Sequence, residues 1–154
     1  MALILLNNCI FAIQLGKIPT AFILDGENGE TVSGKPWNSK MLKNKIHVLF
    51  YISPDKKDEN ESFFKKLSFK AYNKNLYASI AIVNLKGTWL PNFAIEKMME
   101  KQQEKYPETL YIKDKNKYLI KKWELSDNSS NIIIFNKIGK IIYLNKGITN
   151  RSFK

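Results

Sequence analysis

The sequence predicts an α/β domain with a mixed β-sheet that is flanked by helices. Two continuous apolar runs, at 46–52 and 79–85, have the pattern of strands buried on both faces, as in the middle of a parallel sheet. A helical pattern follows each run, which indicates two β-to-α crossovers. Two apolar segments at 131–135 and 140–144, separated by a turn that contains Gly139, predict a β-hairpin. These observations favour one domain with helices on both faces of the sheet.

The other elements follow from local patterns in chain order. A short strand at 21–24 runs into turn-forming residues at 25–29, so 31–32 is expected to return as the second strand of a hairpin. A short strand at 109–112 and one or two helical turns within 116–123 are expected later in the chain. The first helix is expected at 58–73, and its apolar stripe consists of Phe63, Phe64, Leu67 and Ala71. The second helix is expected from Pro91 to about 105, and one of its faces consists of Ala94, Ile95, Met98 and Gln102.

The chain carries a net charge of +11, but its cations are of the kind that argues against nucleic acid. Of the 25 basic residues, 24 are Lys and one is Arg151, whereas arginine provides the forked contacts that base and phosphate recognition favours. The chain also has 19 Ile against 3 Val, and 16 Asn. Lys, Ile and Asn share A/T-rich codons, so coding bias explains the charge without any ligand. We therefore do not expect nucleic acid as a partner.

The first twelve residues have features of an export signal. They contain an apolar stretch that ends in a small residue, so Ala12 would be the last residue removed. No Lys or Arg precedes the stretch, and Asn7 and Asn8 interrupt it. Residues 1–12 are therefore a signal peptide or its remnant, or else a retained segment that packs on the domain. The first alternative predicts a periplasmic protein and the second a cytoplasmic one. No apolar run reaches the roughly 20 residues that span a bilayer, and Cys9 is the single cysteine.

Several segments, in the same order, resemble the bacterial YtfJ family of the thioredoxin-like superfamily. The similarity runs from about 16 to 147 and leaves 148–154 as a short tail. The segments that carry it are Gly16-Lys17-Ile18-Pro19, Val48-Leu49-Phe50-Tyr51, Pro54-Asp55, Lys57-Asp58, Asn60, Ser79-Ile80-Ala81-Ile82, Asn84, Thr88-Trp89, Pro91-Asn92-Phe93, Lys101-Gln102, Pro107-Glu108-Thr109, Lys113-Asp114-Lys115, Trp123 and Gly139-Lys140. The resemblance implies a secreted thioredoxin-like domain of gammaproteobacteria with no settled activity. It also implies a closing C-terminal helix, which is expected to be missing or truncated here and to leave one face of the sheet with less cover.

The turn after the first buried strand lacks the chemistry that the resemblance would place there. A thioredoxin-type site needs two thiols three residues apart at the start of a helix, where the helix dipole lowers the pKa of a thiol. The matching positions hold Asp55-Lys56-Lys57-Asp58, and the segment SDNSSN at 126–131 has no proline for the cis-proline of such a site. We therefore expect no thiol–disulfide exchange, no cofactor and no catalytic residue.

The acidic residues of this turn have a structural explanation. Asp58 followed by Glu61 fits a capping box, in which Asp58 accepts hydrogen bonds from the N–H groups of the first helical turn. The alternative is an enzyme with carboxylate chemistry at Asp55 and Asp58. No metal site is expected, because Lys56 and Lys57 would weaken cation binding. His47, the only histidine, is expected to be structural, and the lysines of 113–122 are expected to form a solvated face.

The loops after the two buried strands form the predicted binding surface. Parallel strands deliver their carboxyl ends to one edge, where open α/β sheets bind ligands, so the turn 53–60 and the loop 88–92 should be neighbours. Trp89 is either an exposed contact or a cover for the core. The candidate ligand- or partner-binding residues are Pro54, Asp55, Asp58, Asn60, Trp89 and Asn92.

The sequence favours a non-redox binding or accessory module of the cell envelope, with an envelope protein as the partner considered first. It leaves two other function classes open. These are an enzyme that uses the two aspartates, and a basic cytoplasmic protein with a regulatory or nucleic-acid-associated role. The sequence does not determine the oligomeric state.

Overall fold

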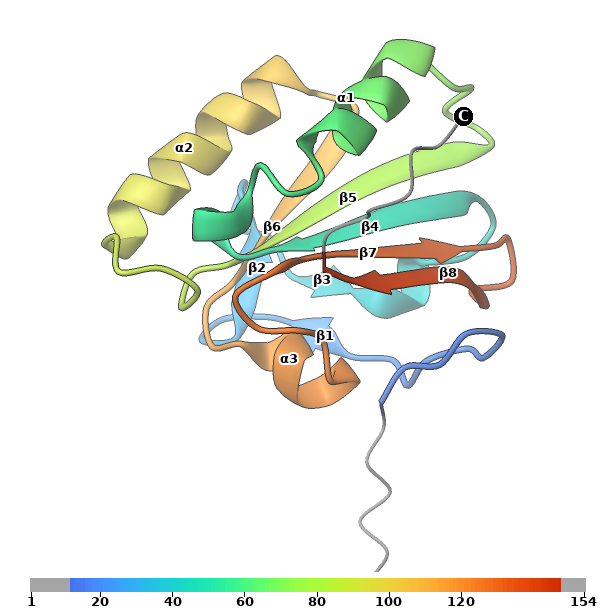
Figure 1. The fold of residues 1–154 in the computed structure, drawn as a ribbon, viewed down its shortest axis with the longest axis horizontal. Coiled ribbons are helices and arrows are strands. Elements are labelled where there is room, and N and C mark those ends of the chain that lie inside the picture. The colour runs from blue at the N-terminus through green and yellow to red at the C-terminus, as the bar shows by residue number, and fades with distance from the viewer. Residues whose placement is uncertain (1–11, 148–154) are drawn as a thin grey trace, which may run out of the picture.

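The computed structural model describes residues 12–147, which form a six-stranded mixed sheet between two layers (Figure 1). Helices α1 and α2 cover one face of this sheet, and α3 lies on the other face together with a small sheet of β1 and β3. In chain order the elements are β1 (Ile23–Leu24), β2 (Gly29–Thr31), β3 (Trp37–Asn38), the 3-10 helix η1 (Ser39–Met41), β4 (Ile46–Ile52), the 3-10 helix η2 (Pro54–Lys56), α1 (Glu61–Lys70), β5 (Tyr77–Asn84), α2 (Asn92–Lys105), β6 (Thr109–Asp114), α3 (Tyr118–Trp123), β7 (Ser130–Phe135) and β8 (Ile141–Lys146).

Three parallel strands form the centre of the large sheet, whose strand order is β2-β6-β5-β4-β7-β8. β4 pairs in parallel with β5, and β5 pairs in parallel with β6. The hairpin of β7 and β8 continues the sheet antiparallel to β4, and β2 adds an antiparallel strand at the opposite edge. The mixed sheet, the two crossover helices and the late hairpin that the sequence predicted are all confirmed.

The predicted hairpin between 21–24 and 31–32 is wrong. The turn itself forms, since the Asn28 N–H donates to the Asp25 carbonyl at 3.1 Å. The strands that flank it enter different sheets, because β1 pairs with β3 while β2 pairs with β6. Gly29 explains why β2 can approach β6 so closely: a Cβ at this position would lie 2.0 Å from the Lys113 carbonyl oxygen.

Alternating side chains of the central strands fill two separate layers. In β4, Leu49 and Tyr51 point into the layer of α3, whereas Val48 and Phe50 point toward α1. Trp123 at the end of α3 is fully buried and packs edge-to-face on Phe22, with ring centroids 4.8 Å apart. Side chains of β5 and β6 pack in the same alternating way against α2. This burial on both faces is why the central strands have continuous apolar sequences.

Helix α1 is shorter than predicted and lies on the surface of its layer. It spans Glu61–Lys70, with Asn60 at the N-cap position, and none of its residues is fully buried. Phe63, Phe64 and Leu67 are half-buried against the sheet. Ala71, which the sequence assigned to the apolar stripe, is instead an exposed C-cap in the left-handed conformation, with φ of 43°.

The buried face of α2 differs by one residue from the predicted face. Ile95 and Met99 are buried, whereas Met98 is 44% exposed and Gln102 is exposed. The side chain of Gln103 sets this rotation, because it bonds to the backbone of β6. Its Nε2 donates to the Thr109 carbonyl at 2.8 Å, and its Oε1 accepts from the Tyr111 N–H at 3.1 Å.

Some sequence predictions fall on residues outside the described range of 12–147. They are the leader with Cys9, the tail 148–154 and the missing or truncated closing helix. Among the helices within 12–147, none is long and apolar enough to cross a membrane.

Candidate binding edge at the carboxyl ends of the parallel strands

The turn 53–60 is tied to the start of β7 by side-chain hydrogen bonds. The Asn60 amide donates to the Ser130 carbonyl at 2.8 Å and to the Gly147 carbonyl at 3.3 Å. The Glu59 carboxylate accepts from the Ser130 N–H at 2.9 Å. Asn60 is 3% exposed, so this candidate binding residue holds the turn in place and offers little surface to a partner.

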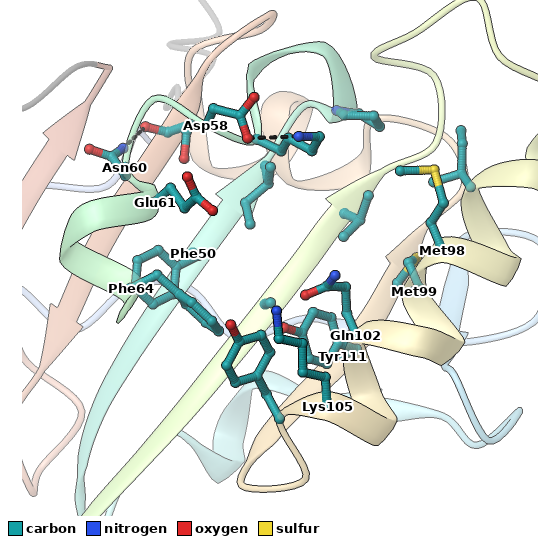
Figure 2. Close-up of a pocket in the computed structure, with 18 of the residues that line it drawn as sticks. Phe50, Asp58, Asn60, Glu61, Phe64, Met98, Met99, Gln102, Lys105 and Tyr111 are labelled. Atoms are coloured by element: carbon teal, nitrogen blue, oxygen red, sulfur yellow. Dashed lines mark hydrogen bonds and ion pairs between the residues drawn. The ribbon is translucent and has the colours of Figure 1, made fainter. Parts of the chain in front are cut away.

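Asp58 does not form the predicted capping box. The helix begins at Glu61, so Asn60 and not Asp58 occupies the N-cap position. The Asp58 carboxylate is largely exposed and accepts from the Lys57 ammonium at 2.7 Å. Figure 2 shows Asp58 at the rim of a groove, with Asn60 beside it.

The turn 53–60 and the loop 88–92 are neighbours, as the sequence predicted. The Thr88 hydroxyl donates to the Asp55 carboxylate at 2.6 Å. The next residue, Trp89, is 86% exposed, so the interpretation of Trp89 as a cover for the core is wrong. Asn92 is exposed at the start of α2, and Pro54 is half-buried at the start of η2. Below, these two loops are together called the shared edge.

Buried polar residues lie beneath the shared edge. Ser53 is fully buried, and its hydroxyl has no hydrogen-bond partner among the described residues. Asn84, also fully buried, accepts from the Lys86 N–H at 3.0 Å and donates to the Asp127 carboxylate at 3.4 Å. A Cβ at Gly87 would lie 2.9 Å from the Ser53 hydroxyl oxygen, so glycine allows this close contact between the loop and the turn.

Asp127 also bonds to the Lys117 ammonium. This hydrogen bond lowers the pKa of the Asp127 carboxyl below its ordinary value. The ion pair fixes the segment before β7 against the start of α3. It therefore supports the same edge of the sheet from the side opposite to α1.

A groove of about 240 Å³ opens between α1 and α2 beside the shared edge (Figure 2). Its floor is formed by side chains of β4, β5 and β6, including Phe50, Val83 and Tyr111. Phe64 of α1 and Met99 of α2 face each other across it. Its rim is polar and consists of Lys57, Asp58, Glu61, Lys65, Gln102 and Lys105. An apolar floor with a charged rim suits amphipathic groups.

Similarity to known proteins identifies the family of this chain. The family described as "Bacterial protein of unknown function (YtfJ_HI0045)" matches residues 21–152. The chain belongs to this family. It is 26% identical over 141 residues to the uncharacterized protein YtfJ of Escherichia coli K12, a match that covers 85% of this chain and 75% of YtfJ.

Solved structures that resemble the YtfJ-family chain are thioredoxin-like. One is the pneumococcal exposed lipoprotein thioredoxin Etrx1 of Streptococcus pneumoniae, with a TM-score of 0.61, 15% identity, and coverage of 85% of this chain and 92% of Etrx1. Another is a thiol peroxidase from Chromobacterium violaceum, with a TM-score of 0.63, 10% identity, and coverage of 93% and 81% respectively. A secreted disulfide oxidoreductase of Mycobacterium tuberculosis gives a TM-score of 0.57 at 15% identity, with coverage of 83% and 84%. The predicted fold class is confirmed. Because the sequence identities are low, these similarities support the fold and nothing further.

Sequence reasoning missed most of the support beneath the shared edge of this YtfJ-family chain. Asn84 and Thr88 belong to the segments that resemble the family, but no local pattern assigns them a partner. Gly87 carried a signal that could have been used, since a glycine between a buried strand and an exposed loop often marks close backbone approach. Asp127 and Ser53 carried none, because their neighbours come from distant parts of the chain.

Two further predictions concern charged residues away from the edge. His47 is buried, as expected for a structural histidine: it is 6% exposed and its Nδ1 lies 3.1 Å from the Lys45 carbonyl. Burial lowers the pKa of His47 below its ordinary value.

The prediction that 113–122 is a solvated face is wrong for Lys113, which is buried and pairs with Glu30 at 2.9 Å. Hydrogen bonds from Lys113 and then Lys115 lower the pKa of the Glu30 carboxyl.

Asp114 is fully buried among hydrogen-bond donors. It accepts from the Tyr51 hydroxyl at 3.0 Å and from the N–H groups of Tyr118 and Leu119 at 2.8 and 3.0 Å. Burial and the Asp114 carboxylate raise the pKa of Tyr51.

Within residues 12–147 no group of three or more His, Cys, Asp or Glu side chains is arranged to hold a metal ion.

Proposed function

We propose that this chain is a non-redox binding or accessory module of the bacterial cell envelope that contacts a partner through the shared edge. The observation that carries the proposal is the Thr88–Asp55 hydrogen bond at the residue that directly precedes the exposed Trp89. It fixes two loops from different strands into one surface. An exposed, rigid aromatic beside polar groups is a common anchor for a protein partner.

The non-redox part of the proposal rests on the chemistry of the turn. The carboxylates of Asp55 and Asp58 occupy the junction between β4 and α1, and they cannot exchange disulfides. No cysteine occurs between residues 12 and 154. Asp55 accepts from Thr88 and Asp58 from Lys57, so these bonds engage each carboxylate separately. This arrangement favours a binding surface over a paired carboxylate site.

The envelope part of the proposal rests on the leader and on the relatives. Residues 1–12 have the apolar composition of an export signal. Two solved structures with the same fold are described as an exposed lipoprotein thioredoxin and as a secreted disulfide oxidoreductase. Those two proteins are described as exposed and as secreted, which supports an envelope location for this chain.

Export is tested by the N-terminus of the protein purified from its own cells and by the fraction that contains it. We expect a periplasmic protein that begins at Ile13, after removal of Ala12. An intact Met1 on soluble cytoplasmic protein would count against the envelope role. The non-redox role is tested by insulin-reduction and peroxide assays on the full-length chain, which keeps Cys9, and on its Cys9→Ser variant. We expect no thiol-dependent turnover, and turnover that disappears in Cys9→Ser would contradict the proposal.

Partner contact is tested by photo-crosslinking from position 89 in intact cells. A photoreactive benzoylphenylalanine replaces Trp89 in one strain and Phe69 in a control strain, because both side chains are 86% exposed but Phe69 lies near the far end of α1. We expect a discrete crosslinked protein from position 89 and none from position 69. For that purified protein, Trp89→Ala should weaken binding on the order of 30-fold, as expected for a hot-spot aromatic. Equal crosslinking from both positions would argue against the shared edge.

A further inference from the structure

The positive charge of this chain is concentrated in particular segments. All 14 acidic residues lie within 25–30, 55–61 and 96–127. The segments 1–24, 31–54, 62–95 and 128–154 contain none; the first carries Lys17 alone, and each of the others carries at least four lysines. A coding bias toward lysine explains the number of cations, but it does not explain acid-free segments that meet in space.

Loops from the first, second and fourth of these segments meet at the end of the sheet opposite the shared edge. In Figure 1 the β7–β8 turn lies at the right-hand end of the sheet, and the connections from β4 to α1 and from β5 to α2 lie at the left-hand end. Three of the loops at this end form what we call the basic end; the loops before β5 and β6 lie at the same end of the sheet and carry the Lys74–Glu108 ion pair. The loops of the basic end are 15–19, 39–45 and 136–140, and its lysines are Lys17, Lys40, Lys43, Lys45, Lys137 and Lys140.

Backbone hydrogen bonds hold the three loops together. The Asn44 N–H donates to the Lys137 carbonyl at 2.7 Å, and the Ile141 N–H donates to the Lys17 carbonyl at 2.9 Å. A hollow of about 160 Å³ separates the side chains, and it is lined by Ile18, Lys40, Lys43 and Ile138 among others. The basic end is therefore one surface built from distant parts of the chain.

Aliphatic side chains protrude from every loop of the basic end, and the loop 15–19 contributes both Leu15 and Ile18. Ile18, Met41 and Ile138 are 62%, 60% and 62% exposed. Each of them directly follows a lysine in the sequence, and Met41 lies at the end of η1. Exposed aliphatic side chains among lysines combine apolar surface with positive charge, the two features that bind proteins to anionic lipid. Apolar side chains enter the boundary between headgroups and acyl chains, while lysines are attracted to anionic headgroups.

We propose that the basic end docks on an anionic phospholipid bilayer. Nucleic acid is the other polyanion that lysines attract, but it offers no apolar layer for these protruding aliphatic side chains. The described basic end also contains no arginine, the residue best suited to phosphate forks. Docking through this end points the shared edge away from the membrane, where it is free to meet a protein partner. The membrane proposal rests on residues outside the shared edge, so it and the proposal of partner contact through the shared edge can fail independently.

Vesicle co-sedimentation of the purified protein tests the proposal. We expect binding to vesicles of phosphatidylglycerol and phosphatidylethanolamine, weak binding to phosphatidylcholine vesicles, and loss of binding as salt increases. The triple variant Lys40→Gln, Lys43→Gln, Lys137→Gln should lower the partition coefficient on the order of 100-fold, given the contribution of a lysine at an anionic surface. The matched control Lys86→Gln, Lys97→Gln, Lys101→Gln removes the same charge from exposed sites elsewhere and should bind nearly as the parent does. Ile18→Ser with Ile138→Ser should also weaken binding while circular dichroism stays unchanged.

Trp89 reports the orientation of the bound protein. It is the one exposed tryptophan of three, since Trp37 and Trp123 are buried. If the basic end docks, Trp89 fluorescence keeps its accessibility to acrylamide when vesicles are added. Protection of Trp89 by vesicles, or equal losses of binding in the two triple variants, would overturn the proposal. Tight binding to a DNA duplex without binding to anionic vesicles would overturn it in favour of nucleic acid.

Discussion

The Thr88 hydroxyl donates a 2.6 Å hydrogen bond to the carboxylate of Asp55, and this bond joins the loops that follow two neighbouring parallel strands. The two residues are 33 positions apart in the chain. Thr88 Oγ1 also accepts from the Leu90 N–H at 3.3 Å, so one side chain links the turn to the loop and orders the loop itself. Trp89 lies between Thr88 and Leu90, the two residues of the loop that this side chain joins.

Removing the Thr88–Asp55 bond should cost little stability but should show coupling between the two residues. In a double-mutant cycle with Thr88→Val and Asp55→Ala, we expect a coupling free energy of about 0.5–1 kcal/mol from urea unfolding. Asp58→Ala combined with Thr88→Val is the control, since Asp58 pairs with Lys57 instead. A coupling near zero in the first cycle would mean that the bond does not persist in solution.

Trp89→Ala should leave the free energy of unfolding within about 0.5 kcal/mol of the parent, because its side chain contributes almost nothing to the core. Trp123→Ala provides the contrast, since that side chain is fully buried between Phe22 and Phe135. We expect it to lose about 3–5 kcal/mol. Chemical denaturation of both variants measures the difference. A loss for Trp89→Ala similar to that for Trp123→Ala would place Trp89 in the core.

The sequence predicts the parts of this fold that depend on local patterns. The run at 46–52 matches β4 to the residue, because a strand buried on both faces has an apolar side chain at nearly every position. The same logic predicts that the turn and the loop after two parallel strands are neighbours. The position of the α2 face was missed by one residue because Gln103, a polar residue, faces the sheet and bonds to β6.

Features that depend on distant residues were not predictable from local sequence. The start of α1 is set by Asn60, whose partners Ser130 and Gly147 are 70 and 87 positions away. A capping box that begins at Asp58 fits the local sequence pattern as well as an N-cap at Asn60 does, so the local pattern alone does not locate the start of α1. The groove between α1 and α2 was missed for the same reason, because its floor combines residues from three strands.

Glu30→Gln should destabilise the protein by about 1–3 kcal/mol, because it leaves the buried Lys113 ammonium without its closest carboxylate. The nearest remaining acid is Glu96, at 3.8 Å. Replacing Lys113 with Met in the Glu30→Gln background should recover part of the loss, since the buried charge is then gone. Glu27→Gln is the control, as that side chain is exposed. Urea unfolding measures all four proteins, and equal stability of Glu30→Gln and Glu27→Gln would contradict the ion pair.

Stability should fall as pH decreases from 7.5 to 5.5, and His47 should be the cause. Burial lowers the pKa of His47 below 6.5, so the unfolded chain binds a proton before the folded chain does. The stability that the neutral, buried ring contributes is therefore present above the unfolded pKa and is lost as pH falls toward the folded pKa. One proton limits the slope to about 1.4 kcal/mol per pH unit. His47 is the only histidine, and the carboxyls with lowered pKa values, Glu30 and Asp127, start from ordinary values of 4.5 and 3.8, below this window. In His47→Gln the free energy of unfolding, measured in urea at pH 7.5 and 5.5, should change much less than in the parent. The same slope in both proteins would show that another group titrates.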